Sequence, residues 1–242
     1  MRKAYATKVK TDMGEGIEHI NHWVAKVRKP LIGKHATDAL MYQAFGHLLD
    51  QYKEILMNCP TLNCHLKHKA QQIVLVRHAV IATGQVTAPT SVYFLEAALV
   101  GPYVKYSSNI DFSIPENQPG MDMDLFQILD AFTHWTYNQS NGKYLMSDLQ
   151  GVGPMLTDPQ ILDMDPNCWA DGNTSSEGIH SFLEMHCCHP GNMVCEALKL
   201  GKAVNLKWVK PIQSFDHLLA SRNNGTPDLS YFNSVSETQR DC

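Results

Sequence analysis

The sequence has 242 residues, of which 44% are hydrophobic and 18% are charged, so the chain is long enough to bury a large core. Its formal net charge of −4 argues against nucleic acid as a partner, because phosphate contacts need a basic face. The longest apolar run, IVLVRHAVIA, is interrupted by Arg77 and His78 and is too short to span a membrane. The amino terminus lacks the apolar stretch of a signal peptide, and we expect a cytoplasmic protein.

The first part of the chain has the pattern of strands around one long helix. KAYATKV and HWVAKVRKP predict a hairpin with the glycine-containing turn TDMGEG, and Lys26 falls in its second strand. QQIVLVRHAVIAT and SVYFLEAALV, on either side of TGQVTAPT, predict two buried strands. Between these pairs, ATDALMYQAFGHLLDQYKEILM predicts an amphipathic helix with apolar positions Leu40, Phe45, Leu48, Leu49, Tyr52, Ile55 and Leu56.

The later part of the chain mixes helices with short strands. MDLFQILDAFTHWTYNQ predicts a helix, and NGKYLMSDLQ predicts a turn followed by a strand. Asp148 and Gln150 fall at the exit of that strand, where side chains two residues apart point the same way, so we expect both to face one ligand. SSEGIHSFLEMHC and NMVCEALKL predict two further helices. From KPIQSF onward the chain becomes polar, and we expect a poorly ordered tail.

The stretch SDLQGVGPMLTDPQI concentrates oxygen ligands beside a Gly-x-Gly turn. Asp148 can accept a proton or orient a hydroxyl group, while Gln150 offers a neutral oxygen and Asp158 a charged one. Mg²⁺ prefers a few such oxygens together with substrate phosphates, and phosphoryl transfer adds a lysine that holds the nucleotide. Lys26 in VAKV is the candidate for that lysine. A glycine-rich turn with solvated acids is the alternative, and this pattern alone leaves both open.

The stretch HCCHPGNMVC indicates a metal site, because seven cysteines without a secretory signal do not suggest a disulfide framework. His186 and Cys188 lie two residues apart, Cys195 follows, and His134 lies upstream in AFTHWTY. Two imidazoles and two thiolates would close a tetrahedral structural zinc site, whose lack of an open position argues against a zinc hydrolase. Ordinary buried cysteines are the competing explanation. The same cluster holds two alternative ligands, Cys187 and His189.

Together these motifs resemble the alpha-kinases, atypical protein kinases that include the myosin heavy-chain kinases, elongation-factor-2 kinase and the channel-linked kinases. The resemblance runs from Arg2 to about Leu200 and rests on YVKYSSN, DAFTHWTY, SDLQGVGPMLTDPQI, DGNTSSEGI and the H-x-C…C-E-A-L stretch. It implies an α+β, two-lobed, atypical protein-kinase-like fold with a β-rich N-terminal lobe and a mixed, zinc-containing C-terminal lobe. The expected boundaries are 1–100 and 101–205 for the lobes and 206–242 for the C-terminal tail.

The resemblance also implies a role for each matching position. Asp148 corresponds to the catalytic aspartate, and Lys26 to the lysine that holds the nucleotide phosphates. Gln150 and Asp158 correspond to the metal-holding pair. Two further positions match the nucleotide site, Glu96 at the adenine-side hinge and Lys105 near the active site. The zinc ligands of the larger lobe correspond to His134, His186, Cys188 and Cys195.

The implied function is that of an ATP-dependent protein serine/threonine kinase, which transfers the γ-phosphate of Mg-ATP to a Ser or Thr of a protein substrate. ATP, Mg²⁺ and structural Zn²⁺ are the implied cofactors. The alternative is a catalytically weak or inactive alpha-kinase-like module for binding or scaffolding. It rests on a start inside the region of the family's first strand, and on GNTSSEG, where Ser175 replaces a glycine of the family's loop. The long helix also offers no obvious acid for Lys26, with Asp38 and Asp50 as the candidates.

Overall fold

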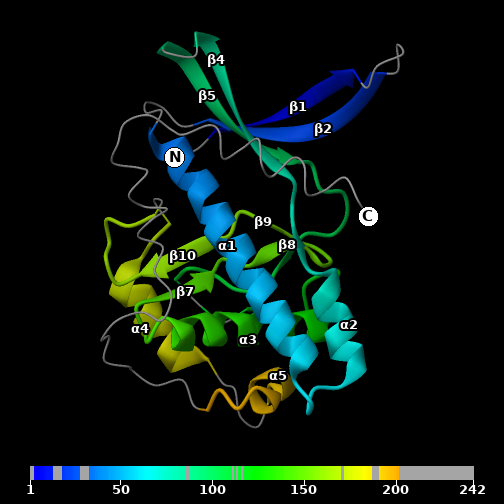
Figure 1. Cartoon of the computed structure of the whole chain (residues 1–242), viewed down its shortest axis with the longest axis vertical. Coiled ribbons are helices and arrows are strands. Elements are labelled where there is room, and N and C mark those ends of the chain that lie inside the picture. The colour runs from blue at the N-terminus through cyan, green and yellow to red at the C-terminus, as the bar shows by residue number, and fades with distance from the viewer. Residues whose placement is uncertain are drawn as a thin grey trace.

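The computed structural model describes residues 3–12, 18–27, 33–85, 88–110, 112, 114–115, 117–169, 172–186 and 191–201. One four-stranded sheet stands above the rest of the molecule, and a long helix runs from it across two smaller sheets and the remaining helices (Figure 1). This is the mixture of helices and sheets that the sequence predicts. The tail beyond residue 205, which we expect to be poorly ordered, lies outside the described residues.

The upper sheet contains β1 (Lys3–Asp12), β2 (Glu18–Val27), β5 (Ala88–Ala97) and β4 (His78–Gln85), in this spatial order. All neighbouring strands are antiparallel. The expected hairpin is confirmed as β1 and β2, and Lys26 lies in its second strand, opposite Phe94 of β5. Because β2 has a partner on both sides, Lys26 is held on an inner strand of the sheet.

The expectation that QQIVLVRHAVIAT forms one buried strand is wrong. Its first residues end helix α2 (Cys64–Gln72), which begins where the Asn63 side chain accepts a hydrogen bond from the amide of Leu66. The short strand β3 (Val74–Leu75) then pairs with β9 (Met155–Thr157) of a lower sheet, and β4 begins only at His78. The outer half of β4 is exposed. An apolar run cannot distinguish a helix end from a strand, and the capping asparagine was the missed signal.

Helix α1 (Gly33–Asn58) packs its apolar side against α3 (Met123–Gln139), whose bounds agree with the sequence pattern. The Phe132 ring of α3 lies 5.4 Å from Phe45 and 5.1 Å from Tyr52 of α1. Ile55, expected on the buried side of this helix, is 37% exposed instead. Ile55 lies in the last turn of α1, which ends at Asn58.

Two small sheets complete the lower part of the molecule. One pairs β7 (Tyr144–Ser147) with β10 (Gln160–Asp163), and the other has the order β3-β9-β8-β6, with β8 (Gln150–Val152) and β6 (Val104–Lys105). Helices α4 (Ser175–Met185) and α5 (Met193–Ala197) confirm the two expected near the end, although α5 stops before Leu198. The strand expected in NGKYLMSDLQ is confirmed as β7, and Asp148 lies at its exit. The strand alternation expected to reach Gln150 does not hold, because Asp148 has a φ of 55° and Gln150 begins β8.

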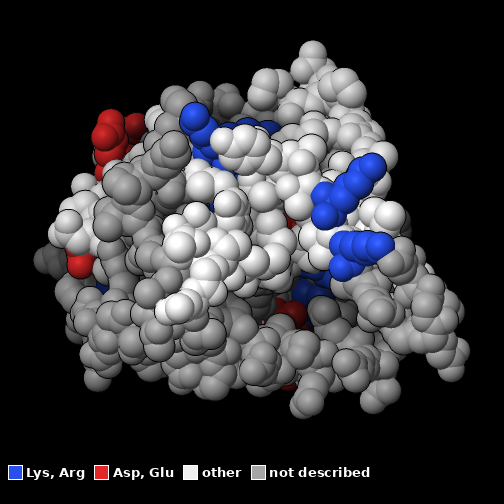
Figure 2. All heavy atoms as spheres, turned by 90° about the horizontal axis from the view of Figure 1, so that it is seen from above, with Lys and Arg blue, Asp and Glu red and all other residues white. Residues whose placement is uncertain are grey.

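Charged side chains of the described residues are visible on the face of the molecule that is seen from above (Figure 2). Seen from above, lysine and arginine side chains lie in separate places among uncharged residues (Figure 2). Among the helices in the described ranges, none combines enough length and apolar character to cross a membrane.

Replacing Phe132 by alanine should lower the free energy of unfolding by about 3–5 kcal/mol, the usual range for a buried aromatic ring. Phe132 of α3 is fully buried against α1, so the cavity left by its ring has no access to solvent. Met57→Ala is the control, because Met57 of α1 is 45% exposed and its loss should change stability by only about 0.5 kcal/mol. Urea unfolding curves measure both, and equal effects would contradict this packing.

Candidate functional site

Lys26 connects the upper sheet to the lower part of the molecule. Its Nζ lies 2.7 Å from Oε2 of Glu96 and 3.0 Å from Oδ1 of Asp158. Phe94 lies opposite Lys26 and Glu96 follows two residues later, so strand alternation places Glu96 on the same face of the sheet. Asp158 comes from the turn that leads out of β9. The lysine side chain is only 12% exposed, and the ion pair is therefore largely withdrawn from solvent.

The acids that pair with Lys26 are Glu96 and Asp158, and neither of the two possible partners in the long helix does so. Asp38 is buried within α1, and Asp50 lies exposed on the outer side of the same helix. Strand alternation could have identified Glu96 had the pairing of β2 with β5 been known. That pairing joins segments about seventy positions apart, and the sequence alone does not reveal it.

Asp148 forms the second charged contact of the site. Lys105 Nζ lies 2.9 Å from its Oδ1, and Gln150 Nε2 donates to its Oδ2 over 3.1 Å. Lys105 and Gln150 are themselves opposite each other in β6 and β8. The same Gln150 nitrogen lies 3.5 Å from the main-chain oxygen of Asp158. Asp148 and Gln150 thus face a common point, as expected, although through a chain turn and not through one strand.

The site holds more carboxylates than lysines, and the pKa values of several of its side chains are raised. Burial raises the pKa of Glu96, against the opposing charge of Lys26. Burial also raises the pKa of Asp148, which Lys105 opposes. The pKa of Tyr103 is raised by burial and then by the charges of Asp158, Asp148 and Glu96. The concentration of negative charge suits a site that binds a divalent cation.

The backbone around the two aspartates is held in an uncommon conformation. Asp148 has a φ of 55° and Asp158 a φ of 49°, both in the left-handed region that costs a non-glycine residue about 1–3 kcal/mol. Gly151 is the first glycine of the Gly-x-Gly turn. A larger residue does not fit there, because its Cβ would clash with the carbonyl oxygen of Met155. The main-chain amide of Asp158 donates to the hydroxyl oxygen of Tyr42 over 2.7 Å.

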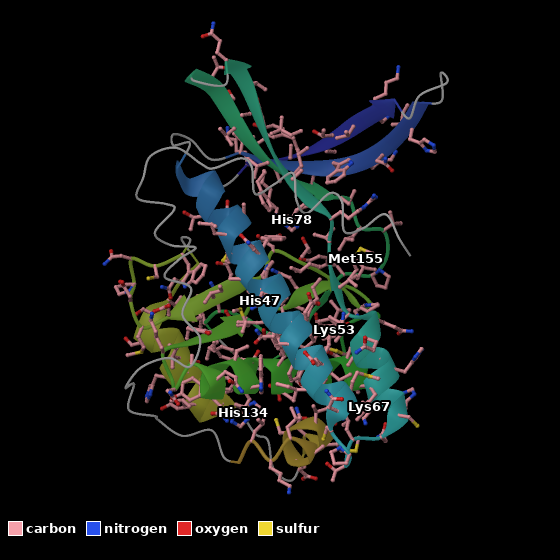
Figure 3. The ribbon with its side chains drawn as sticks, in the orientation of Figure 1. His47, Lys53, Lys67, His78, His134 and Met155 are labelled. Carbon is pink, nitrogen blue, oxygen red and sulfur yellow. The ribbon has the colours of Figure 1, made fainter. Side chains whose placement is uncertain are left out.

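A second cluster of side chains comes from α3, α5 and the end of α4. Nε2 of His186 lies 3.1 Å from Nδ1 of His134, and the sulfur of Cys195 lies 3.8 Å and 3.7 Å from these two nitrogens. His134 and Cys195 are fully buried, and the His186 side chain is too. Figure 3 shows His134 low in the molecule, whereas His78, the first residue of β4 and opposite Glu96 of the Lys26 site, lies high in it. The cluster is therefore separate from the site around Lys26.

The three groups of this cluster could hold a metal ion. Ligand atoms around a tetrahedral zinc lie roughly 3–4 Å apart, which the observed spacing matches. Asp130 Oδ1 lies 3.0 Å from Nδ1 of His186, and this contact turns the other ring nitrogen toward the cluster. The Asn192 amide donates to the other oxygen of Asp130 over 3.0 Å. The remaining candidates lie outside the described residues: Cys187, Cys188 and His189.

Sequence reasoning missed two tyrosines that belong to the site. Tyr103 precedes Lys105 by two residues, and the alternation in YVKY could have indicated that both face the same way. Tyr42 sits on a helix among other apolar positions, and no local signal distinguishes it from an ordinary core residue. Its contact with Asp158 joins residues 116 positions apart.

Comparison with known proteins shows one family. The protein-family model of the alpha-kinase family matches residues 1–192. Myosin heavy chain kinase C of Dictyostelium discoideum is 28% identical over 158 residues, covering 60% of this chain and 19% of that protein. Human eukaryotic elongation factor 2 kinase is 33% identical over 108 residues, covering 45% of this chain and 14% of that protein. The matched part of the chain therefore spans less than a fifth of the length of each of these relatives.

Solved structures show the same fold. The alpha-kinase domain of myosin-II heavy chain kinase A in complex with AMP-PNP superposes with a TM-score of 0.59 at 22% identity, covering 77% of this chain and 67% of that chain. The inactive alpha-kinase domain of myosin heavy chain kinase A in complex with ATP gives a TM-score of 0.58, also at 22% identity, with the same coverage of both chains. At this identity the likeness concerns the fold.

Lys26→Met should destabilise the protein by about 3 kcal/mol near neutral pH, because it leaves the Glu96 carboxylate buried without its cation. The variant raises the pKa of Glu96 further in the folded state. Glu96 is neutral in both folded and unfolded states below about pH 4, so the loss of stability should be small there and grow as the pH rises through the raised pKa.

The matched control for this prediction is Lys53→Met. Lys53 of α1 donates to the main-chain oxygen of Ile73 over 3.0 Å, so its removal strands no carboxylate. Its effect should stay constant between pH 4 and 7. Urea unfolding at several pH values measures both variants, and a loss for Lys26→Met that does not vary with pH would show that Glu96 does not depend on Lys26.

Proposed function

Because the chain belongs to the alpha-kinase family, we propose that it is an ATP-dependent protein serine/threonine kinase, transferring the γ-phosphate of Mg-ATP to a protein substrate. The observation that carries this proposal is the convergence of Lys26, Asp148, Gln150 and Asp158 around one point. Phosphoryl transfer needs a cation on the phosphates, oxygen ligands for a metal and an acid near the acceptor hydroxyl. Two of the relatives are named as kinases, and ATP is bound in one of the structural neighbours.

Each residue of the set has a role that its surroundings support. Lys26 would hold the nucleotide phosphates, and the buried Glu96 carboxylate 2.7 Å away would keep its side chain extended toward them. The oxygen of the Gln150 amide and the carboxylate of Asp158 would hold Mg²⁺, which when bound supplies charge neutralisation on the phosphates. Burial, and then the charges of Asp158, Asp148 and Glu96, raise the pKa of Tyr103, and this gathering of carboxylates supports the binding of a cation here.

Asp148 would orient the acceptor hydroxyl and accept its proton. Burial raises the pKa of this carboxyl group, while the Lys105 ammonium 2.9 Å away favours the charged form. The balance keeps a carboxylate with increased proton affinity next to the reacting group, which is what a general base requires. The Gln150 amide donates to the other carboxylate oxygen and limits its rotation.

The alternative, a weak or inactive binding module, is not favoured. Its main support is Ser175 in the place of a loop glycine, yet Ser175 adopts a φ of 54°, the conformation for which glycine is usually needed. The Ser175 amide donates to Asn173 Oδ1, and its hydroxyl donates to the main-chain oxygen of Met164. These two bonds offset the strain, so the substitution does not by itself disrupt the loop.

The organisation of the chain is part of the same proposal. We propose a β-rich N-terminal lobe in residues 1–100, a C-terminal lobe in residues 101–205 and a tail in residues 206–242. The separate upper sheet supports the first lobe, although α2 and β3 pack with the lower part. We also propose that His134, His186 and Cys195 hold a structural zinc ion, with Cys188 as the fourth ligand.

Asp148→Asn and Asp158→Asn should each lower phosphate transfer from Mg-ATP by at least about 100-fold, because one removes the base and the other a metal ligand. Asp50→Asn, at an exposed acid of α1, should retain full activity. Radiolabelled ATP measures autophosphorylation and transfer to a test protein, and phosphoamino-acid analysis identifies the acceptor. Phosphotyrosine as the main product would contradict serine/threonine specificity, and full activity of Asp148→Asn would contradict its role.

The purified protein should contain about one zinc ion per chain, and Cys195→Ser should lower both this content and the melting temperature. Because the ion would join α3, α4 and α5, its loss should lower the melting temperature by roughly 10 °C. Cys168→Ser is the control, since the Cys168 thiol contacts Asp165 and not the cluster. Elemental analysis and thermal melting with and without a chelator provide the measurements. Identical melting with and without the chelator would rule out the site.

A further inference from the structure

Tyr42 of α1 contacts three parts of the structure with one side chain. Its ring centroid lies 4.8 Å from that of Phe94 in β5 and 4.7 Å from that of His78 in β4. Its hydroxyl oxygen accepts a hydrogen bond from the main-chain amide of Asp158 over 2.7 Å. The residue is 1% exposed, so this oxygen acts in a dry environment where a hydrogen bond is strong. Tyr42 thus links the long helix and the upper sheet to the turn that carries Asp158.

The turn at Asp158 needs such a support. Asp158 has a φ of 49°, and the following Pro159 restricts its backbone further. The residue lies just outside β9, beyond the last residue pair of the β8–β9 ladder. An amide at such a position requires an acceptor from elsewhere in the fold, and the Tyr42 oxygen provides it. The direction of the Asp158 side chain follows from this backbone, and its carboxylate reaches Lys26 at 3.0 Å.

We propose that Tyr42 is a positioning residue for Asp158, whose hydroxyl oxygen holds the turn so that the Asp158 carboxylate faces the metal–nucleotide position. This inference rests on the proposed kinase function, because it assigns Tyr42 a part in metal binding. The contact also makes the site depend on the placement of α1. The tyrosine ring is held by Phe94 and His78, so the oxygen stays in place only while α1 keeps its position against the upper sheet.

The competing explanation is that Tyr42 is an ordinary core tyrosine, and the same helix provides a matched comparison. Tyr52 is fully buried, packs on Phe132 and Trp135, and donates its hydroxyl to the main-chain oxygen of Ile128 over 2.9 Å. Its hydrogen bond also joins α1 to another segment, but at α3 and not at the site. Tyr52→Phe therefore reproduces the structural loss of Tyr42→Phe without touching Asp158.

The experiment compares Tyr42→Phe and Tyr52→Phe with the unaltered chain. Both variants keep their aromatic rings, and thermal melting should show similar, modest losses of stability. Hydrogen–deuterium exchange of the ligand-free protein should be faster in Tyr42→Phe for the peptide that contains Asp158, and unchanged there in Tyr52→Phe. Binding of Mn²⁺ in the presence of ATP, followed by electron paramagnetic resonance, should weaken about tenfold in Tyr42→Phe only, in proportion to the loss of one buried hydrogen bond.

Kinase activity distinguishes a failure of the proposed function from a failure of the proposed role of Tyr42. The turnover number of Tyr42→Phe should fall about tenfold at a saturating concentration of the protein substrate, with that of Tyr52→Phe unchanged. An unaltered chain that neither binds Mn²⁺ with ATP nor transfers phosphate overturns the proposed function, and with it the role of Tyr42 in metal binding. If the unaltered chain is active but Tyr42→Phe and Tyr52→Phe have the same hydrogen–deuterium exchange and the same metal affinity, the inference about Tyr42 is overturned. The proposed function is then unaffected.

Discussion

The arrangement of the upper sheet over the lower part of the molecule depends on the ion pair of Lys26 with Glu96 and Asp158. Glu96 is 4% exposed, and a charge so buried is tolerated only with a partner in good geometry. The antiparallel register of β2 and β5 provides that geometry on one side, and the turn after β9 brings Asp158 to the other. The upper sheet is therefore tied to the lower part through the same lysine that would hold the nucleotide.

The rest of the site consists of supports for two aspartates in unfavourable backbone conformations. Leu149, between Asp148 and Gln150, donates its amide to the hydroxyl of Ser107, and its main-chain oxygen accepts from the amide of Tyr106. Gly151 allows β8 and β9 to approach closely, and Tyr42 holds the amide of Asp158. Strain of this kind persists only where the surroundings determine the conformation several times over. Its concentration at both aspartates agrees with the role we propose for them.

The His134 cluster lies in a different part of the chain but contacts the same helices. It joins α3 to α5 and to the end of α4, and α3 in turn packs its Phe132 ring against α1. Helix α1 then carries Tyr42 to the turn of Asp158. A continuous path of buried contacts thus leads from the His134 cluster through two helices to the site. A loss of order in the cluster would first disturb the packing of α3 and α1, because these helices share one core.

What the sequence by itself determined were the features that depend on neighbouring residues. The hairpin that carries Lys26, the helix at Met123–Gln139 and the grouping of His186 with Cys195 follow from local periodicity, turn residues and short spacing. Motif resemblance added the family, which the comparisons confirmed. Only the tertiary structure decided that Glu96 pairs with Lys26, that the chain turns at Asp148 and that Tyr42 meets Asp158. The contacts of Glu96 and Tyr42 join distant segments, so they depend on how the elements pack against one another and no local pattern in the sequence specifies them.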